Sequence, residues 1–213
     1  MPIRHSCSRL LLRGLGLLLA GTAAPVWGAS PSQQEFETAV DGSKAEARSL
    51  GWALRTDGLW MAMLKSRTPM MAAVTAGTCH IGYSPYAPGR DYGWLFPDLE
   101  PTDRGVWLAA LVRHELAHCL DGETDTGTGS ERWREAYADL AFALHVDANA
   151  SRPDELIRRL VSLRQAHAAT DPAHDTAAVL LCYLAHPQRG TRSAVALSWP
   201  AQLSLWRARC PPP

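Results

Sequence analysis

The sequence LAALVRHELAHCL, residues 108–120, combines the apolar spacing of a largely buried helix with two histidines. His114 and His118 are four residues apart, so on a helix they lie on the same face, where both imidazoles can bind one zinc ion. Glu115 occupies a position on the apolar stripe where a hydrophobic residue is expected. Beside a metal, its carboxylate would serve as a general base toward a zinc-bound water.

Around this helix the sequence predicts a mostly helical α+β domain. The helix itself is expected to begin at Thr102 or Asp103 and to end at Asp121-Gly122. Two β-rich segments, residues 74–83 and 91–96, predict a small antiparallel sheet before it, whose exposed edge could pair with an extended peptide. The other expected helices, placed by periodicity and capping residues, are residues 33–41, 44–66, 131–146, 153–168, 172–186 and 192–208.

The first 28 residues have the pattern of a secretory signal peptide: a basic start without acidic residues, a short apolar run and small residues up to Gly28. The apolar run, residues 15–24, is too short for a good membrane span. Cleavage after Gly28 would leave one domain, residues 29–213, secreted or periplasmic and without a stable membrane anchor.

The charge of the processed chain is slightly acidic. Removing Arg4, Arg9 and Arg13 leaves 18 of the 21 basic residues against 21 acidic ones, a net charge of −3. No basic cluster is present in the sequence, so we expect no nucleic-acid partner and no polybasic membrane contact.

Four cysteines remain after the expected cleavage, and an even number in an exported chain predicts two disulfides. Three pairings are possible. We favour Cys79–Cys119, which would tie a strand to the histidine helix, and Cys182–Cys210, which would hold the C-terminal tail.

A catalytic zinc site usually has three protein ligands and one open position, so a third ligand is needed. The segment Glu135-Ala-Tyr-Ala-Asp139 begins 17 residues after His118, on the next expected helix. Glu135 and Asp139 are four residues apart and can both face the histidines. Glu131, one turn earlier, is an alternative third ligand.

The two helices together resemble those of the gluzincin zinc metallopeptidases, over residues 103–145. These enzymes carry a His-Glu-x-x-His helix, a loop and a helix with Glu-x-x-x-Asp. The resemblance implies one zinc ion held by the two motif histidines and Glu135, with Glu115 as general base. It also implies that Asp139 accepts a hydrogen bond from the outer nitrogen of a ligand histidine, which would orient the ring.

The same resemblance implies a histidine or tyrosine that stabilises the tetrahedral oxyanion. His174 is our first choice because a helix is expected to begin there, near enough in sequence to fold back over the site. A surface histidine at a helix start is the other interpretation of this residue. Weaker candidates for the same role are Tyr83, Tyr86 and Tyr137.

The resulting hypothesis is an exported zinc metallopeptidase that hydrolyses protein or peptide substrates, with a cell-envelope protein as one candidate partner. Two alternatives stay open. One is a zinc-containing binding or assembly protein of the cell envelope without turnover, and the other is an amidase acting on cell-wall peptide.

Overall fold

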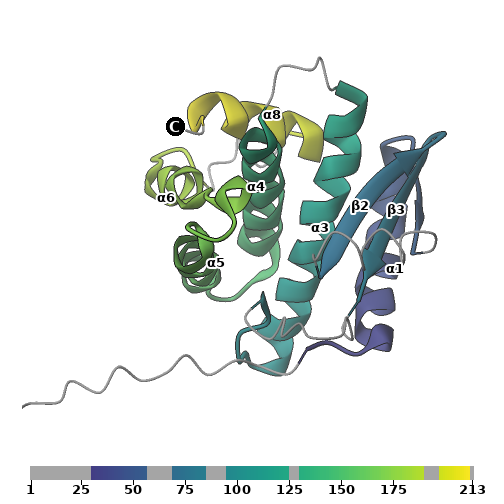
Figure 1. Cartoon of the computed structure of the whole chain (residues 1–213), viewed down its shortest axis with the longest axis horizontal. Coiled ribbons are helices and arrows are strands. Elements are labelled where there is room, and N and C mark those ends of the chain that lie inside the picture. Colours follow the sequence, from purple (N-terminus) through teal and green to yellow (C-terminus); the bar gives the residue numbers. More distant parts are fainter. Residues whose placement is uncertain (1–29, 57–68, 85–94, 125–129, 190–196, 212–213) are drawn as a thin grey trace, which may run out of the picture.

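The computed structural model describes residues 30–56, 69–84, 95–124, 130–189 and 197–211. These residues form a mostly helical α+β domain, which confirms the expected fold class (Figure 1). The expected signal peptide, residues 1–28, lies outside the described residues. In chain order the elements are α1 (Gln33–Ser49), β1 (Ala53–Arg55), β2 (Met70–Thr75), β3 (Thr78–Tyr83), α3 (Pro101–Thr124), α4 (Glu131–Asn149), α5 (Pro153–His167), the 3₁₀ helix η2 (Pro172–His174), α6 (Ala177–Ala185) and α8 (Trp199–Arg209).

Helix α3 stands between the two halves of the molecule (Figure 1). The sheet and α1 lie on one side of it, and α4, α5, α6 and α8 lie on the other. Helices α3 and α4 run antiparallel: the rings of Trp107 and Phe142 meet edge to face at 4.9 Å, while Glu135 contacts His118 near the opposite ends. The histidine helix is therefore buried on two sides, as its apolar stripe predicts.

The sheet has three strands in the order β1-β3-β2 and is mixed rather than purely antiparallel. Strands β2 and β3 form an antiparallel hairpin whose turn, Ala76-Gly77, has positive φ angles of 46° and 74°. Strand β1 pairs parallel with β3, in a region that was expected to continue the helix 44–66. In the expected strand 91–96, the last two residues are described and are not in a strand, and the others lie outside the described residues.

The expected helix 172–186 is divided in the structure, because the 3₁₀ helix η2 ends at His174 and α6 begins at Ala177. Two further expected helix ends are wrong for identifiable reasons. Helix α1 runs without a break through Ser43, whose buried hydroxyl donates to the carbonyl of Ala39 at 3.3 Å instead of capping a new helix. Helix α3 continues past Asp121 to Thr124. The carboxylate of Asp121 accepts a hydrogen bond from Arg207 of α8 at 3.2 Å, so a tertiary contact stabilises a residue that alone favours a helix end.

Two disulfides connect the elements, in the pairing that the sequence favours. Cys79 of β3 bonds to Cys119 of α3, and Cys182 of α6 bonds to Cys210 at the end of α8. The first bridge is buried and holds the sheet against the histidine helix, one residue beyond His118. Among the described helices, none has the length and apolar character that crossing a bilayer requires.

Candidate metal centre

Three side chains from α3 and α4 bring their ligand atoms together. The Nε2 atoms of His114 and His118 lie 3.3 Å apart. Glu135 places Oε2 at 3.3 Å from His114 Nε2 and Oε1 at 3.5 Å from His118 Nε2. In the described part of the chain these three residues are the group of histidine, cysteine and acidic side chains whose ligand atoms lie within 4.8 Å of one another.

These separations fit a tetrahedral zinc site. Zinc binds imidazole nitrogen and carboxylate oxygen at about 2.0–2.1 Å, so two ligand atoms at tetrahedral corners are about 3.3–3.4 Å apart. The three separations between ligand atoms, 3.3, 3.3 and 3.5 Å, match that edge length. Three protein ligands at three corners leave the fourth corner for water or substrate, which is the composition of catalytic rather than structural zinc sites.

Glu115 lines the same cleft but is not part of the ligand group. Its side chain is only 7% exposed, and burial raises its pKa, an effect that the neighbouring His114 and His118 partly oppose. A carboxylate whose pKa is raised toward neutrality is a better general base and general acid than an exposed one. The position of Glu115 on the apolar stripe therefore buries its carboxylate and raises its pKa.

Asp139 contacts the first histidine of the motif. Its Oδ1 lies 3.0 Å from Nδ1 of His114, on the side of the ring opposite the ligand nitrogen. Arg164 of α5 donates to both carboxylate oxygens at 2.9 and 2.6 Å, and the hydroxyl of Thr176 donates to Oδ2. The buried Asp139 thus contacts three side chains, and a carboxylate in this place can orient the ring of His114.

The electrostatics of the cluster favour a cation at its centre. Burial alone would raise the pKa of Glu135, but hydrogen bonds from His114, His118 and His174 hold it well below its usual value. Burial disfavours the charged form of His114, yet the carboxylates of Asp139 and Glu135 raise its pKa to about 10. The buried carboxylates therefore require positive charge between them, which a divalent metal would supply in place of protons.

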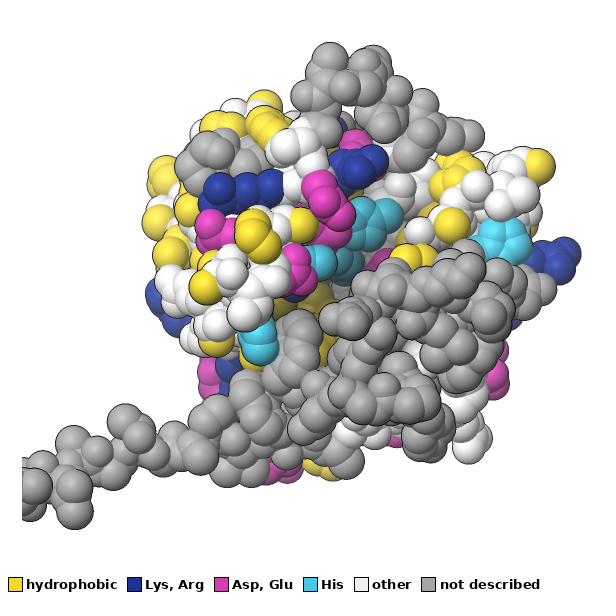
Figure 2. Space-filling model, viewed as in Figure 1, with side chains coloured by type: hydrophobic (Ala, Val, Ile, Leu, Met, Phe, Trp, Pro, Cys, Tyr) yellow, Lys and Arg dark blue, Asp and Glu magenta, His cyan; other side chains and the backbone are white. Residues whose placement is uncertain are grey.

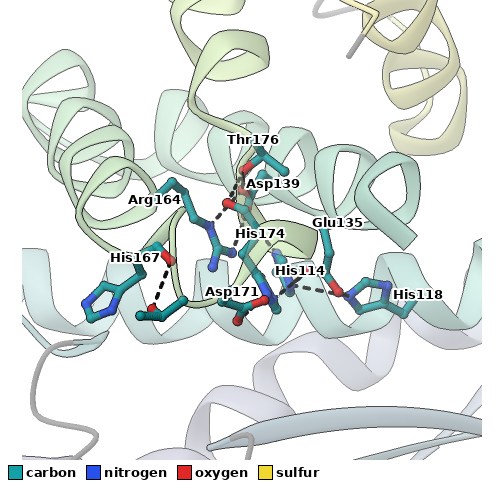
Figure 3. A network of polar contacts seen from close by, with 10 residues as sticks. His114, His118, Glu135, Asp139, Arg164, His167, Asp171, His174 and Thr176 are labelled. Atoms are coloured by element: carbon teal, nitrogen blue, oxygen red, sulfur yellow. Dashed lines mark hydrogen bonds and ion pairs between the residues drawn. The ribbon is translucent and has the colours of Figure 1, made fainter. Parts of the chain in front are cut away.

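His174 reaches the cluster from η2, beyond α5 (Figure 3). Its Nε2 lies 2.9 Å from Oε2 of Glu135, and its Nδ1 lies 2.8 Å from Oδ2 of Asp171. Its ring is parallel to that of His114 to within 14°, with the centroids 6.5 Å apart. His174 is thus beside the ligand group without belonging to it.

The other candidate residues have other contacts. Glu131 is exposed at the mouth of the cleft and is not in the ligand group. The hydroxyl of Tyr83 donates to the carbonyl of Pro31 at 2.8 Å, and Tyr137 packs under the guanidinium of Arg207. Tyr86 lies outside the described residues.

Sequence reasoning missed Asp171, Arg164 and Thr176. Arg164 had a visible signal, since it lies on the apolar stripe of α5, four residues after Leu160, as Glu115 does on α3. Asp171 precedes His174 by three residues, the spacing of one turn, which is a weaker signal. Nothing local marks Thr176, because its contact with Asp139 spans 37 residues.

The centre lies in a cleft of about 580 Å³ between the sheet and the helices. Figure 2 shows imidazole and carboxylate side chains together in a hollow near the middle of this face. Residues 69–74, which include most of β2, form one wall, and β2 is an edge strand of the described sheet.

Comparisons with protein-family models, with curated proteins and with solved structures found no match to this chain.

Proposed function

We propose that this chain is a zinc-dependent peptidase of the gluzincin type. The observation that carries the proposal is the convergence of His114, His118 and Glu135 at the spacing of tetrahedral zinc ligands, with the buried Glu115 beside them. A purely structural zinc site usually has four protein ligands and has no use for an adjacent base. This argues against a binding protein without turnover.

Bound by these three residues, zinc would polarise the substrate carbonyl and lower the pKa of water to about 7. Glu115 would accept the proton of the attacking water and pass it to the leaving amine. His174 would donate from Nε2 to the oxyanion, and Asp171 would keep its other nitrogen protonated and oriented. Asp139 would hold His114 in the tautomer that leaves Nε2 free to bind the metal.

An extended peptide is the substrate that best fits the cleft. The outer edge of β2 borders the metal centre, and an edge strand can pair with an extended chain through main-chain hydrogen bonds. Such pairing would carry a scissile amide past Glu115 in a defined register.

Export is part of the proposal. Two disulfides are more stable in an oxidising compartment, and residues 1–28 have the pattern of a signal peptide. A periplasmic or secreted location would bring protein and cell-envelope peptides within reach as substrates.

The test is the isosteric variant Glu115→Gln, with zinc content and hydrolysis measured on the same samples. We expect one zinc per chain in the wild type and in the variant, and a loss of about 10²–10⁴-fold in peptide cleavage in the variant alone. His114→Ala should lose both zinc and activity. Full activity of Glu115→Gln would refute the mechanism.

Casein and cell-wall peptide, incubated separately with the wild type, separate the candidate functions. Cleavage of casein supports the peptidase, and cleavage of cell-wall peptide alone supports the amidase. Zinc binding without either reaction would identify a binding or assembly protein.

A further inference from the structure

We infer that Arg132 is a positioning residue for catalysis, because it fixes the His174 turn, residues 171–176, over the metal centre. The inference rests on the proposed function. Arg132 lies in the first turn of α4 and donates from Nε to the backbone carbonyl of Asp175 at 2.7 Å and from Nη2 to its carboxylate at 2.8 Å. Asp175 directly follows His174, so the two hydrogen bonds from Arg132 hold the residue next to the proposed oxyanion donor.

The His174 turn has little regular structure of its own to hold it. Within it, His174 N donates to the carbonyl of Asp171 at 3.2 Å, and Thr176 N donates to the carbonyl of His174 at 2.8 Å. These bonds, and the contact of Asp171 with the imidazole, move with the turn as a unit. Attachment to α4 comes from Arg132 on one side and from the Thr176 contact with Asp139 on the other. The imidazole of His174 itself contacts Glu135 of α4 at 2.9 Å between these two points.

Helix α4 carries both the proposed metal ligand Glu135 and Arg132, whose paired contacts with Asp175 we call the clamp. Arg132 and Glu135 are three residues apart on α4, so the helix backbone sets the distance from the clamped Asp175 to the ligand carboxylate. Because Arg132 binds the main chain of Asp175 as well as its side chain, it restricts the backbone next to His174 and not only a side-chain rotamer. The 2.9 Å separation of His174 from Glu135 is the result.

Stability alone is a poor explanation of this pair. The side chains of Arg132 and Asp175 are 32% and 40% exposed, and ion pairs with that access to solvent contribute little to folding. Positioning is different, because a donor displaced by a fraction of an ångström from a developing oxyanion loses much of its effect. The clamp should therefore act on kcat far more than on the free energy of unfolding.

The test compares Arg132→Gln with Arg104→Gln, whose arginine forms a similar partly exposed pair with Glu35 at 3.1 Å, away from the cleft. We expect Arg132→Gln to lower kcat by about tenfold or more, with KM and zinc affinity close to those of the wild type. Arg132→Lys should recover only part of the loss, since an ammonium cannot reproduce the planar fork. Arg104→Gln should leave kcat unchanged.

A double-mutant cycle separates positioning from general damage. If Arg132 acts through His174, then Arg132→Gln should cost little more in the His174→Ala background. Full additivity of the two losses would overturn the inference, as would a wild-type kcat in Arg132→Gln.

A second measurement does not need turnover. Imidazole ring signals of the zinc-loaded protein, assigned with His174→Ala, should shift and broaden for His174 in Arg132→Gln and stay unchanged in Arg104→Gln. Unchanged His174 signals would contradict the clamp even if the wild type cleaved no peptide. Absence of wild-type cleavage with the expected change in signals would refute the proposed function instead.

Discussion

Asp139 links the candidate metal centre to the interior of the helical half. It is fully buried, and it contacts His114 on one side and Arg164 and Thr176 on the other. Burial alone would raise its pKa, but the nearby Arg164 and His114 hold it well below the usual value, so the carboxylate stays ionised. One ionised group thus contacts a proposed metal ligand and neutralises a buried arginine.

Asp139→Asn is expected to weaken zinc binding by about 10–100-fold, because an amide is a weaker acceptor for the Nδ1 proton of His114. The measurement is zinc affinity by competition with a chelator. The matched control is Asp147→Asn on the same helix, which also loses a carboxylate paired with an arginine, here Arg189, but far from the metal ligands.

Asp139→Asn leaves the buried Arg164 with a neutral partner and is expected to lose about 3–5 kcal/mol of unfolding free energy. Asp147→Asn is expected to lose less, because Arg189 keeps its ion pair with Asp154 at 2.7 Å. Zinc affinity is therefore compared at a temperature at which both variants are folded. Equal zinc affinity in the two variants would show that Asp139 does not tune the ligand.

His145 predicts a pH dependence of stability that is separate from the metal centre. Burial, assisted by the nearby positive charge of Arg113, lowers its pKa from 6.5 to about 4. Between these values the unfolded chain binds more protons at this residue than the folded chain does. Unfolding free energy is therefore expected to fall as the pH drops from about 6.5 to about 4, by at most about 3 kcal/mol from this residue.

The variant that tests this is His145→Gln, with urea unfolding of both proteins at pH 7.5, 5.5 and 4.5. Relative to the wild type, the variant should gain stability as the pH falls and show no such gain above pH 6.5. If folding did not shift the pKa of His145, the difference in unfolding free energy between the two proteins would not change with pH.

At the scale of elements, helix α3 could be predicted because its apolar periodicity is long and is interrupted only by Glu115, beside two histidines four residues apart. Strand β1 could not, because Ala53–Arg55 is too short to show a period and is stabilised by pairing with β3. The end of α3 was missed for a similar reason, since Arg207 reaches Asp121 from 86 residues away.

In the candidate site, too, local features could be predicted from the sequence and long-range contacts could not. The roles of Glu135 and Asp139 were predicted from the gluzincin resemblance, whose two-helix pattern of residues the sequence displays directly. The hydrogen bonds of Arg132 and of the Thr176 hydroxyl join segments far apart in the chain, and residue type alone does not predict such contacts.

The two disulfides are expected to differ in their effect on the metal centre. By loop-closure entropy, removing either one costs about 3–4 kcal/mol of unfolding free energy, given sequence separations of 40 and 28. Only Cys79–Cys119 adjoins a proposed ligand, His118. Replacing that pair by alanines should weaken zinc binding as well, whereas replacing Cys182–Cys210 should leave zinc affinity unchanged.

Urea unfolding and chelator competition on the two double variants measure these quantities. Loss of zinc affinity in the Cys182–Cys210 variant, at a temperature where it is folded, would contradict the assignment of the first bridge as the one that supports the centre.

At the scale of the whole molecule, the two ends of the cleft between the sheet and the helices can be told apart by the path of β2 beside α3. Strand β2 runs alongside α3, since Ala73 contacts Cys119 beyond the histidines, while Met70 pairs with Tyr83 near the beginning of α3. The lining changes along the cleft. Leu111, one turn before His114, and Leu163 of α5 are apolar, and His167 of α5 also lines this side (Figure 3). Glu131 and Arg134, in the first turn of α4, are polar.

A peptide paired antiparallel with β2, the more stable arrangement, would place the residues that follow the scissile bond against Leu111 and Leu163. We therefore expect cleavage before leucine or phenylalanine to exceed cleavage before glutamate by about 10–100-fold in kcat/KM, from the burial of one apolar side chain. Matched peptides that differ only at that position measure the ratio. Leu163→Ala should reduce the preference by removing apolar surface, and a preference that instead tracks the residue before the scissile bond would reverse the inferred direction of the substrate.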